Sequence, residues 1–399
     1  MASKRQTDLK KTILFLDHTA QMGGGEVALF NLVTALDSER FTPVVLLASD
    51  GPLVERLRGT GVETHLLPLD PSVVGARKGG LGASSLLHIA QAARMVGYVL
   101  RLARWARGRR VDLIHTNSLK ADIYGGLAGR LARVPVLWHI RDHIDGEYLP
   151  PRVAATFRLL ARTLPTAVVA ISESVRRRLA SRPGQPVKVV HDGCALHWFA
   201  VPALAAGPPP AAPVVALIGR IAAWKGQHVF LRAAALTLRD RPGVRFQIVG
   251  SAMFGEEEYE RSLHDLAGEL GLGDRIEFLG FRDDVPALLA STDVVVHAST
   301  LGEPFGQVVI EGMAAGRPVV ATNAGALPEI ITDGETGLLV PPDDARAIAS
   351  AIASLLDNPA RAHAIGSAAR ERVRERFTVA RTCDHIQVLY DQILRTAEP

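Results

Sequence analysis

The chain has 399 residues, of which 48% are hydrophobic and 22% are charged, so it is long enough to form two domains with ordinary cores. Its formal net charge of +4 is too small for this length to indicate nucleic-acid binding. No run approaches the ~20 apolar residues of a membrane span, and the first apolar run is too short for a signal peptide. We therefore expect a cytoplasmic protein that contacts at most the surface of the inner membrane. Cys194 and Cys383 lack metal-ligand spacing and are expected to be reduced thiols.

Short apolar runs alternate with segments of helical periodicity through the first half of the chain. Because these runs are continuous rather than alternating, they predict parallel strands that helices cover on both faces. The predicted strands are 13–16, 44–47, 62–66, 113–115, 134–138 and 167–171. The predicted helices include 26–36, 53–58 and 153–162.

The second half begins the same alternation again. Its predicted strands are 214–218, 245–249, 276–279, 294–297 and 318–321. Its predicted helices are 227–237, 257–271, 285–290, 307–315 and 344–356, and 377–395 has a further amphipathic pattern. The prolines and small residues of 201–213 predict a stiff linker. We expect α/β domains at 1–200 and 214–376, with a C-terminal helix in 377–399 that packs back towards the first domain. Ligands should lie at the carboxyl ends of the strands.

The most informative motif is STLGEPFGQVVIEGM at 299–313, which follows a predicted strand and opens a predicted helix. In that position the backbone N–H groups of Phe305, Gly306 and Gln307 lie at a helix N-terminus, which favours anions and hydroxyl groups. Glu303 precedes the turn, and Glu311 lies about one and a half turns into the helix. Two carboxylates beside such a turn suit a sugar nucleotide. The alternative is a surface pair of glutamates that caps the helix.

Two loops could carry phosphate groups. In IGRIAAWKGQHVFLRA at 218–233, Arg220 and Lys225 follow the first strand of the second half, where two cations would neutralise a diphosphate leaving group. In HTAQMGGGEVALFNL at 18–32, three contiguous glycines permit close approach of a phosphate or sugar. They do not form G-x-G-x-x-G, and the acidic residue of a nicotinamide site is poorly matched, which argues against a dehydrogenase.

Together these stretches resemble glycosyltransferase family 4, whose members are retaining enzymes of the GT-B architecture. The resemblance runs from about residue 12 to 342 and is carried by GR-x4-KG, EPFGQVVIE, AAGRPVVAT, PEIITDGETGLLV and GGGE. It implies two Rossmann-like doubly wound parallel-sheet domains that face each other across a cleft. It also implies transfer of a hexose-type sugar from a UDP- or GDP-sugar to an acceptor hydroxyl, with an acceptor that the sequence does not name.

The resemblance assigns donor binding to residues of both domains: Gly24, Gly25, Arg220, Lys225, Phe305, Gly306, Gln307, Val308 and Glu311. Arg220 and Lys225 would hold the diphosphate, and Glu311 would hold the nucleotide ribose. Glu303, with the amides that follow it, would hold the donor sugar close to the reacting centre. No D-x-D motif occurs where such enzymes place a metal, so no metal and no cofactor are expected.

One part of the family pattern is altered. Many members end a strand of the first domain in T-x-H, whose histidine contacts the transferred sugar, whereas this chain reads VPVLWHIRDH at 134–143. Counting from the proline places Arg141 there, and His139 lies on the same side of the strand. Both are candidates, and the alternative for His139 is a core histidine. His115, Asn117 and Asp142 are weaker candidates for acceptor contacts.

Other functions remain open from the residues alone. A GT-B epimerase or a phosphorylase would have a histidine-rich centre or a cofactor lysine, which the sequence lacks, and a non-catalytic subunit that binds sugar nucleotides would not need the two glutamates and two cations. The segment 91–110 carries six arginines among apolar residues. It is either a crossover helix packed on its sheet or a basic helix that lies on an anionic membrane.

Overall fold

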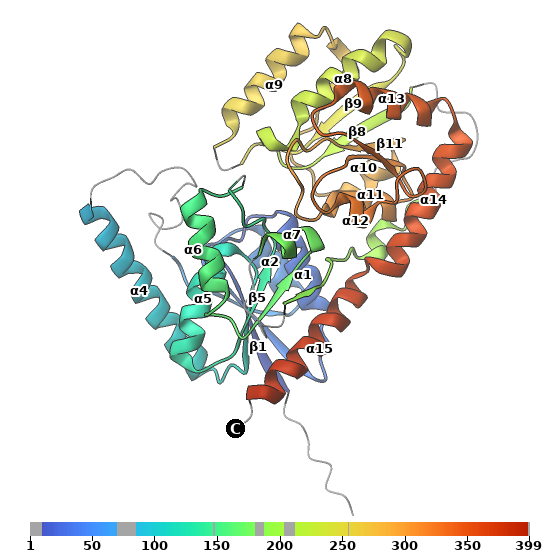
Figure 1. Ribbon diagram of the computed structural model, residues 1–399. Helices are drawn as coiled ribbons and strands as arrows, with labels where there is room; N and C mark the ends of the chain where they lie inside the picture. Colours follow the sequence, from blue (N-terminus) through green and yellow to red (C-terminus); the bar gives the residue numbers. More distant parts are fainter. Residues whose placement is uncertain are drawn as a thin grey trace, which may run out of the picture. The chain divides into compact units, whose positions relative to one another are not determined.

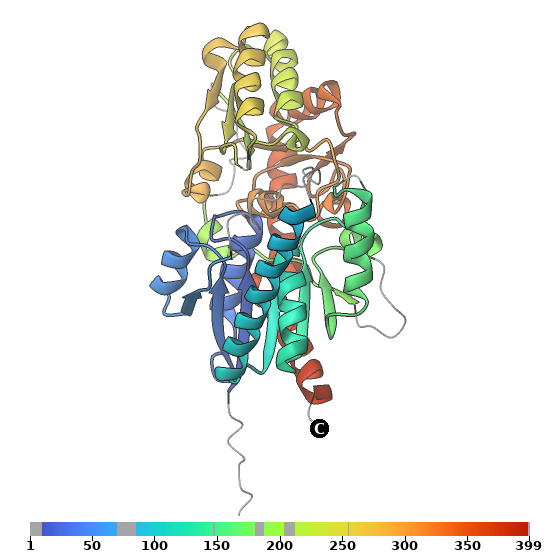
Figure 2. The ribbon, with the colours of Figure 1, turned by 90° about the vertical axis from the view of Figure 1, so that its left-hand side faces the viewer.

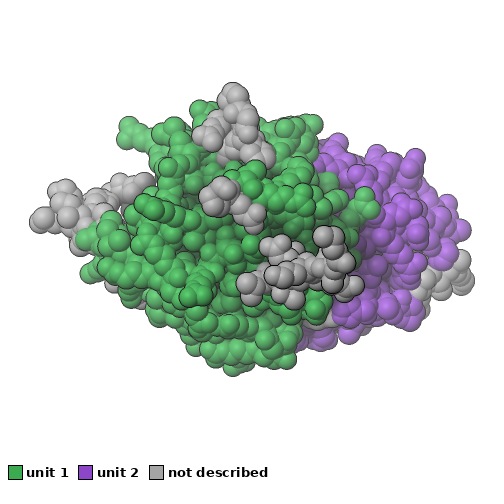
Figure 3. All heavy atoms as spheres, turned by 90° about the horizontal axis from the view of Figure 1, so that it is seen from below, with its two compact units in different colours: residues 1–191, 379–399 green, residues 192–378 purple. Residues whose placement is uncertain are grey.

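The computed structural model describes residues 10–69, 85–146, 148–179, 187–202, 212–253 and 255–397. The chain divides into two compact units, the first made of 1–191 with 379–399 and the second of 192–378 (Figure 3). No helix in the described part of the chain is both long enough and apolar enough to cross a membrane.

The boundary after the first domain was predicted at residue 200, too late in the chain. The second unit begins at Asp192, because Cys194 forms an isolated β-bridge with Thr378 of that unit. The backbone N–H of Cys194 donates to the carbonyl of Phe377 at 3.0 Å. Most of the predicted linker, residues 203–211, lies outside the described residues. Cys194 and Cys383 are both buried and unpaired.

The first unit is built on a parallel sheet with strand order β3-β2-β1-β4-β5-β6-β7. The strands are β1 (Lys11–Asp17), β2 (Phe41–Leu47), β3 (Glu63–Leu66), β4 (Leu113–Thr116), β5 (Val136–Ile140), β6 (Ala167–Ala170) and β7 (Val187–Val189). Six of the seven were predicted, and β7 was missed because three residues are too few to show a period. β5 begins and ends two residues later than predicted, which places His139 inside the strand.

The helices of the first unit are α1 (Gly24–Ala35), α2 (Pro52–Gly59), α4 (Ser85–Gly108), α5 (Leu119–Ala132), α6 (Pro151–Ala161), α7 (Glu173–Arg178) and α15 (Val379–Ala397). Helix α15 returns from the end of the second unit to pack on α1 (Figure 1). Its Ile386, Leu389 and Tyr390 are buried in the same core as Ile13 and Leu137. On the other face of the sheet, α4 lies beside α5 (Figure 2).

The second unit has a parallel sheet with strand order β10-β9-β8-β11-β12-β13. The strands are β8 (Val214–Ile218), β9 (Arg245–Val249), β10 (Ile276–Phe278), β11 (Val294–His297), β12 (Val319–Thr322) and β13 (Leu338–Val340). The helices are α8 (Gln227–Asp240), α9 (Glu257–Glu269), α10 (Val285–Ala290), α11 (Gln307–Ala314), α12 (Leu327–Ile330), α13 (Ala345–Leu356) and α14 (Pro359–Arg376).

The strand orders identify the part of each sheet where a ligand is expected. In the first sheet, β2 and β3 lie on one side of β1, and β4 to β7 lie on its other side, so the strand order reverses between β1 and β4. In the second unit the same reversal separates β8 from β11. Open α/β sheets bind ligands beyond the carboxyl ends of the strands at such a reversal. The predicted motifs lie there: 18–32 follows β1, 218–233 starts at the end of β8, and 299–313 follows β11.

Candidate functional site

A buried ion pair lies at the carboxyl ends of β8 and β11 in the second unit. Lys225 Nζ is 2.7 Å from Glu303 Oε2. The same carboxylate oxygen is 3.1 Å from His297 Nε2 and accepts a hydrogen bond from Ser299 Oγ at 3.2 Å. Only 8% of the Glu303 surface is exposed. The structure thus brings together two predicted site residues, Lys225 and Glu303, and adds two that were not predicted.

This environment keeps Glu303 ionised. Burial alone would raise the pKa of its carboxyl group, but the ammonium group of Lys225 and the hydrogen bond and charge of His297 outweigh it and hold the pKa far below its ordinary value. The carboxylate therefore stays charged although it is buried, and an ionised carboxylate in this position can stabilise positive charge on a bound group.

Two glycines explain why the chain can place these groups so close together. Gly226 has φ +74°, and a Cβ there would lie 1.9 Å from the carbonyl oxygen of Ala298. Gly325 has φ +64°, and a Cβ there would lie 2.2 Å from the carbonyl oxygen of Glu303, which accepts a hydrogen bond from the N–H of Ala326 at 2.8 Å. Any other residue at either position would displace the Lys225 loop or the Glu303 loop.

Helix α11 begins beside this pair, and Gly306 is its N-cap at φ +116°. The N–H groups of Gln307 and Val308 fall in the first turn, where a helix supplies no carbonyl partner. The ring of Phe305 is buried and packs against Phe377, with centroids 6.2 Å apart. One turn along, Glu311 accepts a hydrogen bond from Gln307 Nε2 at 3.1 Å, and burial raises the pKa of its carboxyl group to about 7.

Arg220 follows β8 and lies half-exposed at the same end of the sheet. Its main-chain carbonyl accepts a hydrogen bond from the buried Gln227 Nε2 at 2.9 Å, which ties the loop to the first turn of α8. The loop therefore holds the side chains of Arg220 and Lys225 at one end of the sheet. Among the residues that the structure describes, no group of three His, Cys, Asp or Glu side chains is arranged to hold a metal ion.

The first unit also has polar groups at the carboxyl ends of its central strands. Asp17 ends β1 and accepts a hydrogen bond from Asn117 Nδ2 at 2.6 Å. Asn117 follows β4, and its Oδ1 accepts from Arg141 Nε at 2.8 Å. Asn117 was a candidate for acceptor contact, but it is buried and its amide joins Asp17 to Arg141. Asp142 is half-buried and accepts a hydrogen bond from Tyr148 Oη at 2.6 Å.

The two histidines that the sequence offered as site candidates, His115 and His139, are both buried. His115 was a weaker candidate for acceptor contact, and its side chain is fully buried between Phe15, His139 and Tyr390. His139 is also fully buried. Its Nδ1 lies 3.0 Å from His115 Nε2, and its own Nε2 has no hydrogen-bond partner within the described structure. Burial, with the charge of Arg141, lowers the pKa of both imidazoles, that of His115 to about 3.

The glycine loop adds a residue that sequence reasoning passed over. Helix α1 begins at Gly24, so the N–H groups of Gly24 and Gly25 fall in its first turn and have no intrahelical partner. Glu26 follows them, and burial together with the charge of Asp17 raises the pKa of its carboxyl group to about 8. The signal was present in the GGGE motif, but the raised pKa depends on the approach of Asp17 from β1, which no local pattern reveals.

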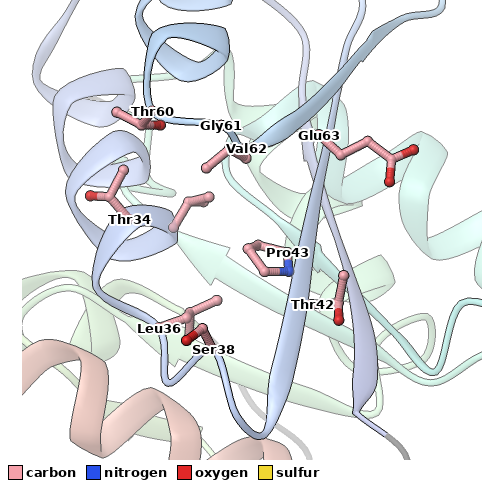
Figure 4. A pocket seen from close by; sticks show the side chains of 10 residues that line it. Thr34, Leu36, Ser38, Thr42, Pro43, Thr60, Gly61, Val62 and Glu63 are labelled. Carbon is pink, nitrogen blue, oxygen red and sulfur yellow. The ribbon is translucent and has the colours of Figure 1, made fainter.

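A separate depression lies at the opposite end of this sheet (Figure 4). It is lined by residues from the end of α1, the start of β2 and the turn before β3, among them Thr34, Pro43, Thr60 and Val62. The lining includes small hydroxyl groups and one carboxylate, and no cation. It lies at the amino-terminal ends of the strands, away from the reversal point, so we assign it no part in the site.

Comparison with known proteins agrees with this arrangement. The sequence matches a family model described as Glycosyltransferase Family 4 over residues 22–198 and one described as Glycosyl transferases group 1 over residues 205–372. A D-inositol 3-phosphate glycosyltransferase of Thermobispora bispora is 30% identical over 318 residues, which cover 74% of each chain. The enzyme of that name from Corynebacterium kroppenstedtii is 34% identical over 47% of this chain and 42% of its own length. The chain spans about half the length of several curated relatives that it matches.

Among solved structures, Anabaena Alr3699/HepE in complex with UDP and glucose is 28% identical, with a TM-score of 0.82 over 95% of this chain and 99% of that chain. A second structure of that protein contains UDP-glucose. Two parallel α/β units of this topology, with such neighbours, define the GT-B fold. Within that fold class, the chain belongs to glycosyltransferase family 4.

Proposed function

We propose that this protein is a retaining glycosyltransferase that moves a hexose-type sugar from a UDP- or GDP-sugar to an acceptor hydroxyl group. The observation that carries the proposal is the Lys225–Glu303 pair at the reversal point of the second sheet, beside the first turn of α11. Cations, an ionised carboxylate and helix amides within one site match the phosphates, the developing positive charge and the hydroxyl groups of a sugar nucleotide. The UDP-glucose complex of the Anabaena protein supports the same class of donor.

In this proposal Arg220 and Lys225 bind the diphosphate and compensate the charge that forms as the bond between the anomeric carbon and the phosphate oxygen breaks. The acceptor oxygen attacks the anomeric carbon on the same face from which the leaving group departs, so the configuration is retained. The proton of the acceptor hydroxyl passes to an oxygen of the leaving diphosphate. Glu303 stabilises positive charge on the sugar, and Glu311 accepts hydrogen bonds from the nucleotide ribose.

A thermal-shift panel of UDP, GDP, ADP and TDP with their common sugar conjugates tests donor binding first. A ligand at 100 times its Kd stabilises the folded state by about 2.7 kcal/mol. We expect UDP or GDP conjugates to raise the Tm of the wild type and of Glu277→Gln, a control on β10 whose carboxylate pairs with Arg245 and Gln247, but not that of Glu311→Ala. If no nucleotide raises the Tm, the assignment of the donor site fails. Proton NMR of the product then tests retention, which an inverted anomeric configuration would exclude.

We further propose that transfer needs no metal ion, because Arg220, Lys225 and the first-turn amides of α11 supply the positive charge. Activity should persist in EDTA, and a large loss that Mn²⁺ or Mg²⁺ restores would contradict this. The remaining alternative is a non-catalytic subunit that binds sugar nucleotides. It would show the same thermal shifts with no release of nucleotide diphosphate in the presence of any acceptor.

We also propose that the first unit contacts an anionic membrane surface through α4, α5 and α6, with the protein on the cytoplasmic side. The exposed arginines of these helices and their caps are Arg94, Arg101, Arg104, Arg107, Arg130, Arg133, Arg152 and Arg162. Within the described side chains of the three helices, the one carboxylate is Asp122, which is fully buried. Val96 and Leu100 are exposed among the arginines of α4, whereas Tyr98 and Leu102 pack inward. A packed crossover helix and a basic outer face are therefore compatible.

A further inference from the structure

The polar neighbours of Glu303 all contact the same oxygen of its carboxylate. Lys225 Nζ lies 2.7 Å from Glu303 Oε2. The same oxygen lies 3.1 Å from His297 Nε2 and 3.2 Å from Ser299 Oγ. The other oxygen, Oε1, has no hydrogen-bond partner among the described residues. Oε1 also retains access to solvent, since it is not one of the enclosed polar atoms of the described structure. The carboxylate is therefore held through Oε2 and presents Oε1 to a ligand.

The direction of each hydrogen bond follows from the charge of Glu303. The pKa of its carboxyl group lies far below the ordinary value, so at neutral pH the carboxylate is ionised and can only accept. His297 Nε2 must then carry a proton and donate it. The other ring nitrogen of His297, Nδ1, is buried and has no partner among the described residues. Within that part of the chain, the imidazole makes its hydrogen bonds only with Glu303 and with Ser299, whose Oγ lies 3.3 Å from Nε2.

The three groups that donate to Oε2 are held in different ways. His297 is the last residue of β11, and Ser299 follows it by two residues, so the pairing of β11 with β8 and β12 fixes both. Lys225 reaches Oε2 from the loop after β8 through a flexible side chain, and in the proposed function its ammonium group also binds the diphosphate. The two groups that follow from β11 therefore hold the carboxylate independently of the substrate, whereas Lys225 is shared with it.

We propose that His297 is a positioning residue for Glu303: by holding Oε2 from the end of β11, it directs Oε1 towards the bound sugar. Without the imidazole, Oε2 keeps only the ammonium group of Lys225 and the neutral hydroxyl group of Ser299. The carboxylate would then follow the ammonium group when the diphosphate draws it away. This rests on the proposed function in that Glu303 faces the sugar of the donor.

Two substitutions at this one buried position form a matched pair. In His297→Gln the side-chain amide nitrogen lies about where Nε2 of the imidazole does, so the variant can still donate to Oε2. In His297→Leu the side chain fills the site but has no proton to donate. Both variants lose the aromatic ring, so the difference between them measures the hydrogen bond. If leucine prevents folding, His297→Met replaces it, because the flexible thioether side chain fills irregular gaps.

Crystal structures of the full-length variants test the inference without any activity assay. In His297→Gln the Glu303 carboxylate should keep the wild-type rotamer, with Oε2 on the amide nitrogen. In His297→Leu, or in His297→Met, it should rotate or occupy more than one rotamer, so that Oε1 no longer has a single direction. A Glu303 carboxylate that keeps the wild-type rotamer in the apolar variant would overturn the inference.

Kinetics supply the second readout, with release of nucleotide diphosphate as the signal. His297→Leu should lose about tenfold in kcat, as expected when a charge-assisted hydrogen bond is lost, and His297→Gln should stay within about threefold of the wild type. The Kd for UDP or GDP alone should be the same in both variants, because the free nucleotide has no sugar for Glu303 to face.

Two kinetic outcomes would contradict the inference. Equal kcat values in His297→Leu and His297→Gln would show that the hydrogen bond to Oε2 does not matter for the reaction. A loss of UDP or GDP binding in His297→Leu alone would show that His297 serves the diphosphate through Lys225. If the wild type binds no sugar nucleotide, the proposed function fails, and the rotamer of Glu303 in the crystal structures still decides the role of His297.

Discussion

The two units share a fold, and near the reversal point of each sheet lies a glutamate whose pKa is shifted in the opposite direction from that of the other. At the reversal point of the second sheet, Lys225 and Glu303 form an ionised pair whose members compensate each other. At the corresponding point of the first sheet, burial and the negative charge of Asp17 raise the pKa of Glu26 to about 8. The ion pair of the second unit suits a ligand that carries its own charge, such as a diphosphate. The neutral carboxyl group of Glu26 in the first unit can both donate and accept hydrogen bonds, which suits the hydroxyl groups of a ligand.

The largest effect should come from breaking the ion pair. Glu303→Gln leaves the ammonium group of Lys225 beside a neutral amide and removes the negative charge that would face the sugar. We expect kcat to fall by about 100-fold or more, as when a single preorganised electrostatic contact is lost from other active sites. Release of nucleotide diphosphate measures it.

The control is Glu277→Gln, which removes a carboxylate from an exposed pair with Arg245 in the same unit. It should leave kcat within about twofold, since exposed pairs contribute little. Near-wild-type turnover by Glu303→Gln would mean that the second unit does not use its ion pair for catalysis, and the contrast between the units would lose its functional meaning.

The next effect concerns how tightly the second unit places that pair. Gly226→Ala adds a Cβ 1.9 Å from a backbone oxygen at φ +74°, whereas Gly334→Ala adds one at φ +76° with no atom within 4 Å. Both variants incur about 1 kcal/mol for the backbone conformation. Only Gly226→Ala must also displace the Lys225 loop, so we expect it to lose several-fold more in kcat and several degrees more in Tm.

Thermal denaturation and the same nucleotide-release assay compare the two alanine variants. Equal losses in both would show that positive φ, and not the contact with the carbonyl of Ala298, makes glycine necessary at this turn.

The basic face of the first unit should give a smaller effect. Arg101→Gln with Arg104→Gln removes two charges from α4, each worth about 1 kcal/mol near an anionic bilayer, so the partition coefficient should fall at least about tenfold. Flotation with vesicles of phosphatidylglycerol and phosphatidylcholine measures it. Arg232→Gln with Arg239→Gln on α8 removes the same charge from exposed positions of the second unit. This control should leave the partition coefficient unchanged. Equal losses in both double variants would indicate attraction by net charge alone.

The contrast between the units also explains what the sequence could reveal. The strands were predictable because parallel strands read as continuous apolar runs, and the donor motifs because each lies in a single loop after a strand. The contacts of His115 were not predictable, because they join β4 and β5 to Tyr390, more than half the chain away. The missed helix α14 is rich in arginine and alanine and has only a narrow buried face, so its periodicity was weak.

The last comparison distinguishes the units by the sign of their pH dependence. Glu26 has a native pKa of about 8, above its ordinary 4.5, so its contribution to stability is complete below pH 4.5 and is lost as pH rises towards 8. Glu303 has a lowered pKa, so its contribution is present above pH 4.5 and is lost only in acid.

Between pH 5 and 8, therefore, Glu26→Gln should gain roughly 3 kcal/mol of unfolding free energy relative to the wild type, because one pKa unit corresponds to about 1.4 kcal/mol and the variant has no carboxyl group to ionise. Over the same range the difference between Glu303→Gln and the wild type should stay constant. Urea denaturation at pH 5, 6, 7 and 8 measures both differences. A flat difference for Glu26→Gln would mean that Glu26 is already ionised at neutral pH, and the polar end of the first sheet would then be as charged as that of the second.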